Sequence, residues 1–171
     1  MIVRTERPDD HDVIAAVVGR AFGSLDVPQL VERFRASAGY VPELALVAED
    51  DGEVVGHIMF TLAELATGTS ILMLSPLAVQ PDRQRRGVGT ALVREGLRLS
   101  AQRTEPLVIV EGDPKYYSRF GFVAASELGL ERPYESIPEA AFQAQPLPAY
   151  AGDARGRVVY PPPLAPLYDA L

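Results

Sequence analysis

The middle of the chain changes from strand-like to helix-like spacing across a short glycine loop. Ser70 to Val79 is rich in apolar residues, and a loop with two glycines follows at Gln84 to Gly89. Apolar residues then recur at helical spacing until about Gln102, and Leu107 to Val110 reads as a buried strand. A strand, a helix and a strand in this order predict a right-handed crossover with two parallel strands. The loop then lies at the carboxyl end of the first strand, where ligands favour binding.

Two more strand-like segments precede this unit. Leu44 to Glu49 and Val54 to Leu62 are separated by Asp50-Asp51-Gly52, which is a hairpin turn signal. They and the Ser70 segment are predicted to be successive antiparallel strands. Before them, the sequence predicts a short strand at Met1 to Thr5, a helix that starts near Pro8, and a second helix over Pro28 to Ala38. We therefore predict an α/β fold whose mixed, mostly antiparallel central sheet is flanked by helices.

Proline shapes two parts of this prediction. Pro76 lies inside a predicted strand, where its missing N–H favours a bulge or a local splay of the sheet. The tail, residues 127–171, is dense in proline but keeps enough apolar residues to pack on a core formed by residues 1–126. Within it, Ser136 and Glu139 have capping-box spacing before a short helix at Ala140 to Phe142, and Gly156 to Tyr160 favours a last strand. We expect a single domain over residues 1–171.

Composition narrows the classes of function. The 171 residues include no cysteine, which excludes disulfides, thiolate metal sites and a cysteine nucleophile. The net charge of -7 disfavours nucleic acid as a partner and mildly favours amines. No apolar run is long enough for a membrane span, so we expect a cytoplasmic protein. Neither histidine belongs to a metal-ligand pattern, so we expect no metal. A monomer and a homodimer both remain open.

The glycine loop has the character of an anion site. Gly87 and Gly89 allow the backbone to approach a phosphate closely, and the helix that they open presents unpaired N–H groups. Arg83, Arg85 and Arg86 concentrate positive charge beside the loop in an otherwise acidic chain. This combination suits a diphosphate.

Two motifs carry a family resemblance. Leu77-Ala78-Val79, Pro81, and Gln84-Arg85-Arg86-Gly87-Val88-Gly89 followed by Ala91-Leu92 resemble the acetyl-coenzyme A motif of GNAT-superfamily N-acetyltransferases. Gly112 to Phe122 resembles a later segment of that superfamily, in which a tyrosine precedes Gly-Phe by four residues, as Tyr117 does. Pro42-Glu43-Leu44, Val55-Gly56-His57-Ile58, Ser75-Pro76 and Gly112-Asp113-Pro114 narrow the resemblance to the YhbS-like branch. It covers roughly the whole chain.

The resemblance implies a cofactor and a reaction. It implies that acetyl-coenzyme A (acetyl-CoA) binds in a splayed groove and that an amine acceptor, a small molecule or a protein, attacks the thioester directly. The diphosphate meets the loop, and the pantetheine pairs with the strand before it. The matched positions are Leu77, Ala78, Val79, Gln84, Arg85, Arg86, Gly87, Val88, Gly89 and Thr90.

Two side chains are candidates for proton transfer. The resemblance places Tyr117 as the general acid, because a phenol is protonated at neutral pH and can donate to the leaving thiolate. Tyr116 is the neighbour expected to pack. Glu111, at the end of the strand after the cofactor helix, is the first candidate for the base. Glu43, Glu49 and His57 are alternatives, although a hydrogen-bonded core histidine is the simpler interpretation of His57.

Two rival functions remain. Gly87-Val88-Gly89 after a strand, with Glu111 about 20 residues later, partly matches the Rossmann fingerprint of dinucleotide-binding oxidoreductases. Leu92 stands where the third glycine or alanine of that fingerprint belongs, which argues against it. A non-catalytic sensor of acyl-CoA would keep both the fold and the loop. The sequence does not name the acceptor.

Overall fold

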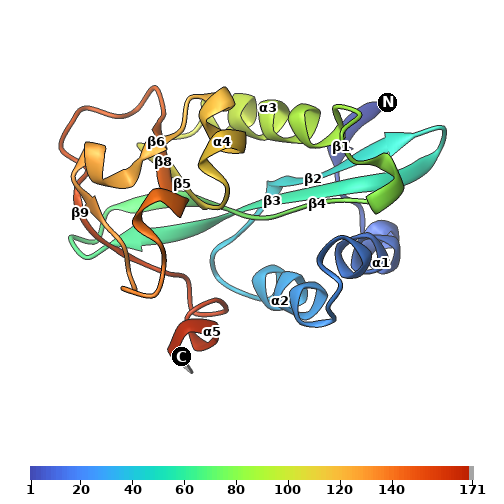
Figure 1. Ribbon diagram of the computed structural model, residues 1–171, viewed down its shortest axis with the longest axis horizontal. Helices are drawn as coiled ribbons and strands as arrows, with labels where there is room; N and C mark the ends of the chain where they lie inside the picture. The colour runs from blue at the N-terminus through green and yellow to red at the C-terminus, as the bar shows by residue number, and fades with distance from the viewer. Residues whose placement is uncertain (170–171) are drawn as a thin grey trace. The chain divides into compact units, whose positions relative to one another are not determined.

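The computed structural model describes residues 1–169, and the chain divides into two compact units. Unit 1 contains residues 1–60 and 75–99, and unit 2 contains residues 61–74 and the chain from residue 100 onward. Strands β3 (Glu53–Leu65) and β4 (Ser70–Val79) pass from one unit into the other (Figure 1). No helix among the described residues is long and apolar enough to cross a membrane.

Unit 1 consists of strands with helices on both sides. β1 (Ile2–Thr5), β2 (Tyr40–Asp50), β3 and β4 follow one another in the sheet. β1 runs antiparallel to β2, with Ile2 opposite Glu49. On one side of these strands lie α1 (His11–Phe22) and α2 (Asp26–Arg35), and on the other lies α3 (Val88–Ser100) (Figure 1). The elements predicted for this half of the chain are all present, with shifted ends.

The hairpin between β2 and β3 has the predicted turn. Asp51 and Gly52 both have positive φ angles, 51° and 81°. A two-residue hairpin turn of type I′ has positive φ at both central residues, and its backbone twist matches the twist of the flanking strands. The Asp51-Gly52 pair therefore predicted the conformation of this turn correctly.

Helix α3 packs on β3 through two glycines. A Cβ atom on Gly56 would stand 2.9 Å from side-chain atoms of both Val88 and Leu92, so the first turns of α3 lie directly on the β3 backbone. One turn further along, the fully buried ring of Phe60 fills the space where Gly96 would carry a side chain. This interlocking of glycine and side chain fixes where α3 begins relative to β3.

Unit 2 is built around β5 (Leu107–Glu111). β4 pairs with β5 in parallel, from Leu72 opposite Val108 to Leu74 opposite Val110, which confirms the predicted parallel pair. On its other edge, β5 pairs antiparallel with β8 (Phe142–Pro146), and β8 pairs with β6 (Val123–Ala124). β9 (Gly156–Val159) joins the end of β3 and runs parallel to β7 (Leu130–Glu131). The predicted fold class, a mixed and mostly antiparallel sheet flanked by helices, is confirmed.

The tail does not contain the short helix predicted at Ala140 to Phe142. Ser136 does not cap a helix: residues Glu139–Ala141 form a single 3₁₀ turn whose preceding residue, Pro138, has an extended backbone and makes no side-chain cap. Phe142, expected at the end of that helix, instead opens β8. The predicted strand at Gly156 is present as β9 and is one residue shorter. Two short helices complete unit 2, α4 (Pro114–Tyr117) and α5 (Pro166–Asp169).

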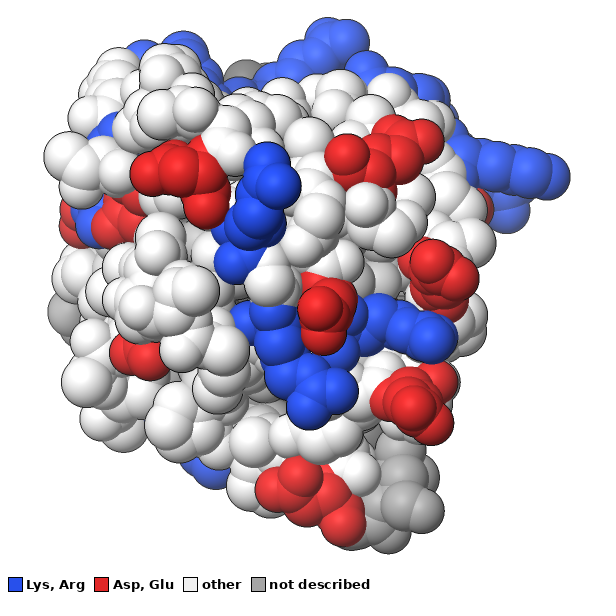
Figure 2. Space-filling model, turned by 90° about the vertical axis from the view of Figure 1, so that its left-hand side faces the viewer, with Lys and Arg blue, Asp and Glu red and all other residues white. Residues whose placement is uncertain are grey.

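Charges of both signs lie interspersed on the face shown in Figure 2. Basic side chains form small groups there, and acidic side chains separate them. A field of a single sign is what steers a polyanion such as nucleic acid to a protein surface. This face does not present one.

Candidate functional site

The loop that precedes α3 is tied to the strands of unit 1. The Gln80 backbone N–H donates to the carbonyl of Val55 at 2.9 Å, and its side-chain amide donates to the carbonyl of Val54 at 3.1 Å. Further along, the Gln84 side chain donates back to the carbonyl of Val79, also at 3.1 Å. Gln84, the glutamine of the predicted motif, therefore closes the loop onto the end of β4 and shapes the loop backbone.

The loop turns sharply before the helix. Arg85 and Gly87 both have positive φ angles, 58° and 87°. The first hydrogen bond of α3 runs from the Ala91 N–H to the Gly87 carbonyl at 3.0 Å. The N–H groups of the preceding helical residues, Val88 to Thr90, have no partner within the helix, as at any α-helix start. Together with the positive end of the helix dipole, they form the kind of surface that binds phosphate.

Positive side chains beside this turn are available for a ligand. Arg85 and Arg86 are exposed, and within residues 1–169 neither makes a hydrogen bond or an ion pair. Arg83, by contrast, is paired with Asp50 at 3.1 Å. Of the three arginines that the sequence singled out, two remain free to contact an anion and one holds the loop to the β2 end.

The predicted pantetheine segment forms the last residues of β4. Ala78 points into the core and is 2% exposed, whereas Leu77 and Val79 are half-buried. The carbonyl of Ala78 lies close to Gly56, 3.2 Å from where a Cβ would stand. This segment is therefore held against β3 by close backbone packing, directly before the loop.

Tyr117 is the last residue of α4, in unit 2. Its side chain is 9% exposed, and its ring packs against those of Tyr116 and Phe122, with centroids 5.0 and 5.6 Å away. A Cβ on Gly112 would stand 2.6 Å from the Tyr117 ring, so glycine at position 112 makes room for it. Within residues 1–169 the hydroxyl has no hydrogen-bond partner. Burial raises the pKa of Tyr117 above its ordinary value, so the phenol keeps its proton at neutral pH.

Glu111 ends β5 and is held by two phenols from the tail. Tyr160 Oη donates to Glu111 Oε2 at 2.9 Å, and Tyr168 Oη donates to the same oxygen at 2.5 Å. Tyr160 immediately follows β9, and Tyr168 lies in α5. Nothing in the local sequence of Glu111 signals these partners, which lie 49 and 57 residues away.

The alternative bases, His57, Glu49 and Glu43, lie in unit 1. His57 is fully buried, and its Nε2 lies 2.9 Å from Glu6 Oε2, so the interpretation of His57 as a hydrogen-bonded core histidine is confirmed. Burial lowers the pKa of His57, which keeps the ring neutral at pH 7. Glu49 accepts from Arg4 Nε at 2.8 Å, and Glu43 is exposed on β2. The Glu6 partner was missed because it is distant in sequence.

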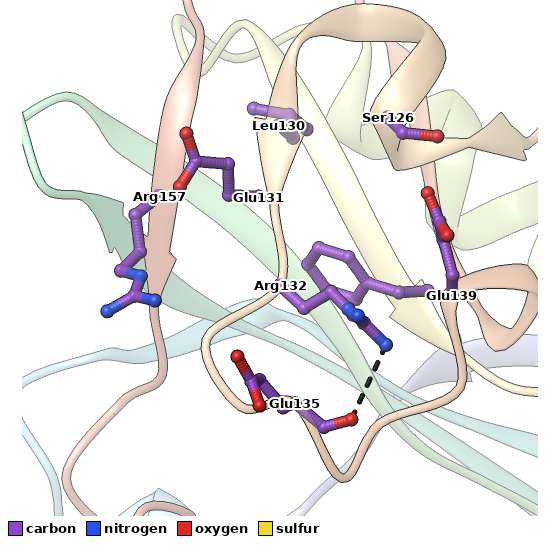
Figure 3. A pocket seen from close by; sticks show the side chains of 8 residues that line it. Ser126, Leu130, Glu131, Arg132, Glu135, Glu139 and Arg157 are labelled. Atoms are coloured by element: carbon purple, nitrogen blue, oxygen red, sulfur yellow. Dashed lines mark hydrogen bonds between the residues drawn. The ribbon is translucent and has the colours of Figure 1, made fainter.

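A hollow of about 290 Å³ lies within unit 2, and the side chains that line it include Glu131, Arg132 and Arg157 (Figure 3). Phe142, the register partner of Glu111, lines it, so this hollow and the Glu111 side chain lie on the same face of that strand pair. Its wall carries both signs of charge, with Arg132, Arg157 and three glutamates. Arg132 donates to the carbonyl of Ile137 at 2.6 Å, which fixes the loop that forms one side.

Metal ligands do not gather anywhere in the described chain. Within residues 1–169, the structure shows no group of three or more His, Asp or Glu side chains with the geometry to hold an ion. The prediction of no metal rests on the sequence pattern and stays a prediction.

Known proteins match this chain in sequence and in structure. The family model of the GNAT acetyltransferase domain matches residues 3–125. The uncharacterized N-acetyltransferase YjhQ of Escherichia coli K12 is 41% identical over 142 residues, which cover 79% of this chain and 76% of YjhQ. The crystal structure of the E. coli GNAT family N-acetyltransferase YhbS in complex with CoA has a TM-score of 0.87 at 31% identity, and covers 96% of this chain and 91% of that one.

A second solved structure agrees. The GNAT family acetyltransferase from Brucella melitensis, in complex with acetyl-CoA, has a TM-score of 0.78 at 30% identity and covers 95% of this chain and 97% of that one. The family model spans well over half of the chain, and the elements that it spans include the β4, loop and α3 unit described above. The chain therefore belongs to the GNAT family of acetyltransferases, as its resemblance to the YhbS-like branch indicated.

Proposed function

We propose that this chain transfers the acetyl group of acetyl-CoA to a primary amine, by direct attack within a ternary complex. The observation that carries the proposal is the turn at Arg85 and Gly87, which leads into the unpaired N–H groups at the start of α3. Two solved relatives support it, since the YhbS structure contains CoA and the B. melitensis structure contains acetyl-CoA. We also place the reaction in the cytoplasm, in agreement with a chain that uses no cysteine.

The loop and the strand before it hold the cofactor in this proposal. The N–H groups of residues 85–90 donate to the diphosphate, and the free guanidinium groups of Arg85 and Arg86 neutralise part of its charge. The pantetheine runs along Leu77 to Val79 and pairs with it as an added strand would. No metal takes part.

Proton transfer is assigned to Glu111 and Tyr117. The acceptor arrives as an ammonium ion and gives one proton to the Glu111 carboxylate, and the neutral amine attacks the thioester carbonyl. As the new C–N bond forms, the carbon–sulfur bond breaks. The Tyr117 hydroxyl donates its proton to the departing thiolate, so CoA leaves as a thiol. The second proton of the amine nitrogen passes through solvent to Tyr117 and restores the phenol, and Glu111 releases its proton to solvent, so that one proton is set free per turnover. The raised pKa of Tyr117 is compatible with this role, because the phenol holds its proton at neutral pH and has it to donate.

The test is release of CoA thiol from acetyl-CoA in the presence of primary amines. The probes are butylamine, 1,4-diaminobutane and lysine amide, each compared with the isosteric alcohol or with no acceptor. Release that depends on an amine, together with the acetylated amine in the mass spectrum, is the expected result. Binding of acetyl-CoA without transfer to any of these amines would contradict the proposal and favour the sensor function.

A further inference from the structure

The Glu111 carboxylate has an unusual set of partners. Both of its protein hydrogen bonds come from neutral phenols, and both go to Oε2. Within the described residues, Oε1 accepts no hydrogen bond and no Lys, Arg or His pairs with the carboxylate. With two donors fixed on Oε2 and no ion-pair partner among the described residues, Oε1 is left available to a cationic ligand.

Three tyrosine rings hold this arrangement in place. Tyr168 stacks on Tyr134, with centroids 5.0 Å apart and an interplanar angle of 13°, and its edge meets Tyr160 at 5.3 Å. Tyr160 is 4% exposed. Tyr134 belongs to the same group of rings but donates its hydroxyl to Asp169 at 3.1 Å. The two phenols on Glu111 are thus fixed by packing, which restricts the carboxylate to one orientation.

The phenols remain donors over the whole working pH range. Burial, together with the negative charge of Glu111, raises the pKa values of Tyr160 and Tyr168 well above the ordinary value for tyrosine. Neither therefore loses its hydrogen bond to Glu111 through titration near neutral pH. Aromatic rings beside an unpaired carboxylate are also surroundings that favour an organic ammonium ion.

We infer that Tyr160 and Tyr168 are positioning residues that hold the Glu111 carboxylate, so that its second oxygen receives the acceptor ammonium. The inference rests on the proposed function, and it makes the C-terminal segment part of the catalytic apparatus. Its consequence for chemistry is specific. The acceptor is a primary amine that binds protonated, transfers one proton to Oε1 and then attacks as the neutral amine.

The test compares Tyr160→Phe, Tyr168→Phe and the matched control Tyr134→Phe, with butylamine, 1,4-diaminobutane and lysine amide as acceptors. All three changes keep the ring, but only the first two remove a hydrogen bond to Glu111. We expect about a tenfold fall in kcat for each of the first two, with the KM for acetyl-CoA unchanged, and less than a twofold change for Tyr134→Phe.

The pH profile separates positioning from a general loss of structure. As the pH approaches the ordinary amine pKa of about 10, free amine becomes neutral and needs no base, so the defects of Tyr160→Phe and Tyr168→Phe should shrink. In a Glu111→Gln background, neither change should lower kcat further. A constant defect at all pH values, additive losses with Glu111→Gln, or full activity in both variants would overturn the inference. If the wild-type chain itself transfers to none of the amines, the proposed function fails first.

Discussion

Gly96 on α3 lies directly over the ring of Phe60 on β3, where any side chain at position 96 would overlap the ring. We predict that Gly96→Ala lowers the free energy of unfolding by about 1–3 kcal/mol, because overpacking forces the ring or the helix to move. This overpacking acts against the stabilisation of up to about 1 kcal/mol that replacing glycine by alanine otherwise brings to a helix interior. Urea denaturation measures it.

Gly19→Ala is the matched control for that change. Gly19 is also helical, but a Cβ there would stand 3.6 Å from Pro28 Cγ, an ordinary contact distance. This variant should be as stable as the wild type or more stable by up to about 1 kcal/mol. Equal losses at the two glycines would show that the Phe60 contact does not decide the packing of α3.

The Glu6 carboxylate stabilises unit 1 by an amount that depends on pH. Burial opposes its ionisation, but hydrogen bonds from His57 and Arg35 outweigh burial and lower the pKa of Glu6 from 4.5 to about 2. Since the folded pKa lies below the unfolded one, this stabilisation is complete above about pH 4.5 and is lost as the pH falls towards 2. We predict that Glu6→Gln costs about 3 kcal/mol at pH 7 and that the difference from wild type shrinks between pH 4.5 and 2.

Glu49→Gln provides the comparison for Glu6. Glu49 also pairs with an arginine, Arg4, but its side chain is 31% exposed whereas that of Glu6 is 2% exposed. A pair that water screens contributes less, so this variant should lose under about 1 kcal/mol. Thermal unfolding from pH 2 to 7 follows both variants. A Glu6→Gln protein whose deficit stays constant over this range would refute the assigned role of the carboxylate.

Arg86 is predicted to bind phosphate and to contribute nothing to folding. Since it has no partner among the described residues, Arg86→Ala should leave the free energy of unfolding unchanged and weaken acetyl-CoA binding about tenfold, the effect of one charge-assisted hydrogen bond. Arg94→Ala removes another exposed arginine, on α3 and further from the loop, and should leave affinity within twofold. Similar affinities for both variants would remove Arg86 from the site.

Tyr117→Phe tests the general acid. The ring is buried, and its hydroxyl makes no hydrogen bond within residues 1–169, so the variant should fold like the wild type. We predict a fall in kcat of about 10²-fold or more with little change in the KM for acetyl-CoA, because only proton donation to the thiolate is lost. Tyr116→Phe, at the neighbouring ring, should keep most of the activity. Undiminished transfer by Tyr117→Phe would end its assignment as the acid.

Local chemistry explains which parts of the fold were predictable from sequence. The Asp51-Gly52 turn was predictable, because positive φ at two successive residues favours an Asp-Gly or Asn-Gly pair. The α3 helix was predictable from apolar residues spaced about 3.6 residues apart, and β5 from its short run of β-branched residues. β8 was missed, since its Gln143 is polar yet 2% exposed, satisfied by the carbonyls of Gly112 and Ala141. Such burial depends on neighbours that a linear pattern does not contain.

The candidate site divides in the same way. The Gln84 to Gly89 loop was recognisable, because glycines that allow close approach of a phosphate and arginines that supply positive charge stand together before a helix. The phenols that hold Glu111 were not, because Tyr160 and Tyr168 reach it from 49 and 57 residues away, through strand pairing and ring packing. From the sequence, the aromatic content of the tail predicts that it packs on the core, and Phe142, Tyr150 and Tyr160 favour a place beside the acceptor groove. Which carboxylate it contacts is a property of the folded chain.

The central claim is tested most directly by calorimetric titration of the purified protein with acetyl-CoA, with NADH as the comparison ligand. Gly89→Trp blocks the first turn of α3, and Arg94→Trp places the same bulk on an exposed part of that helix. We predict that acetyl-CoA binds to the wild type and to Arg94→Trp, that Gly89→Trp abolishes binding, and that NADH does not bind. Binding of NADH without acetyl-CoA, or acetyl-CoA binding that survives Gly89→Trp, would contradict the assignment of this loop as the cofactor site.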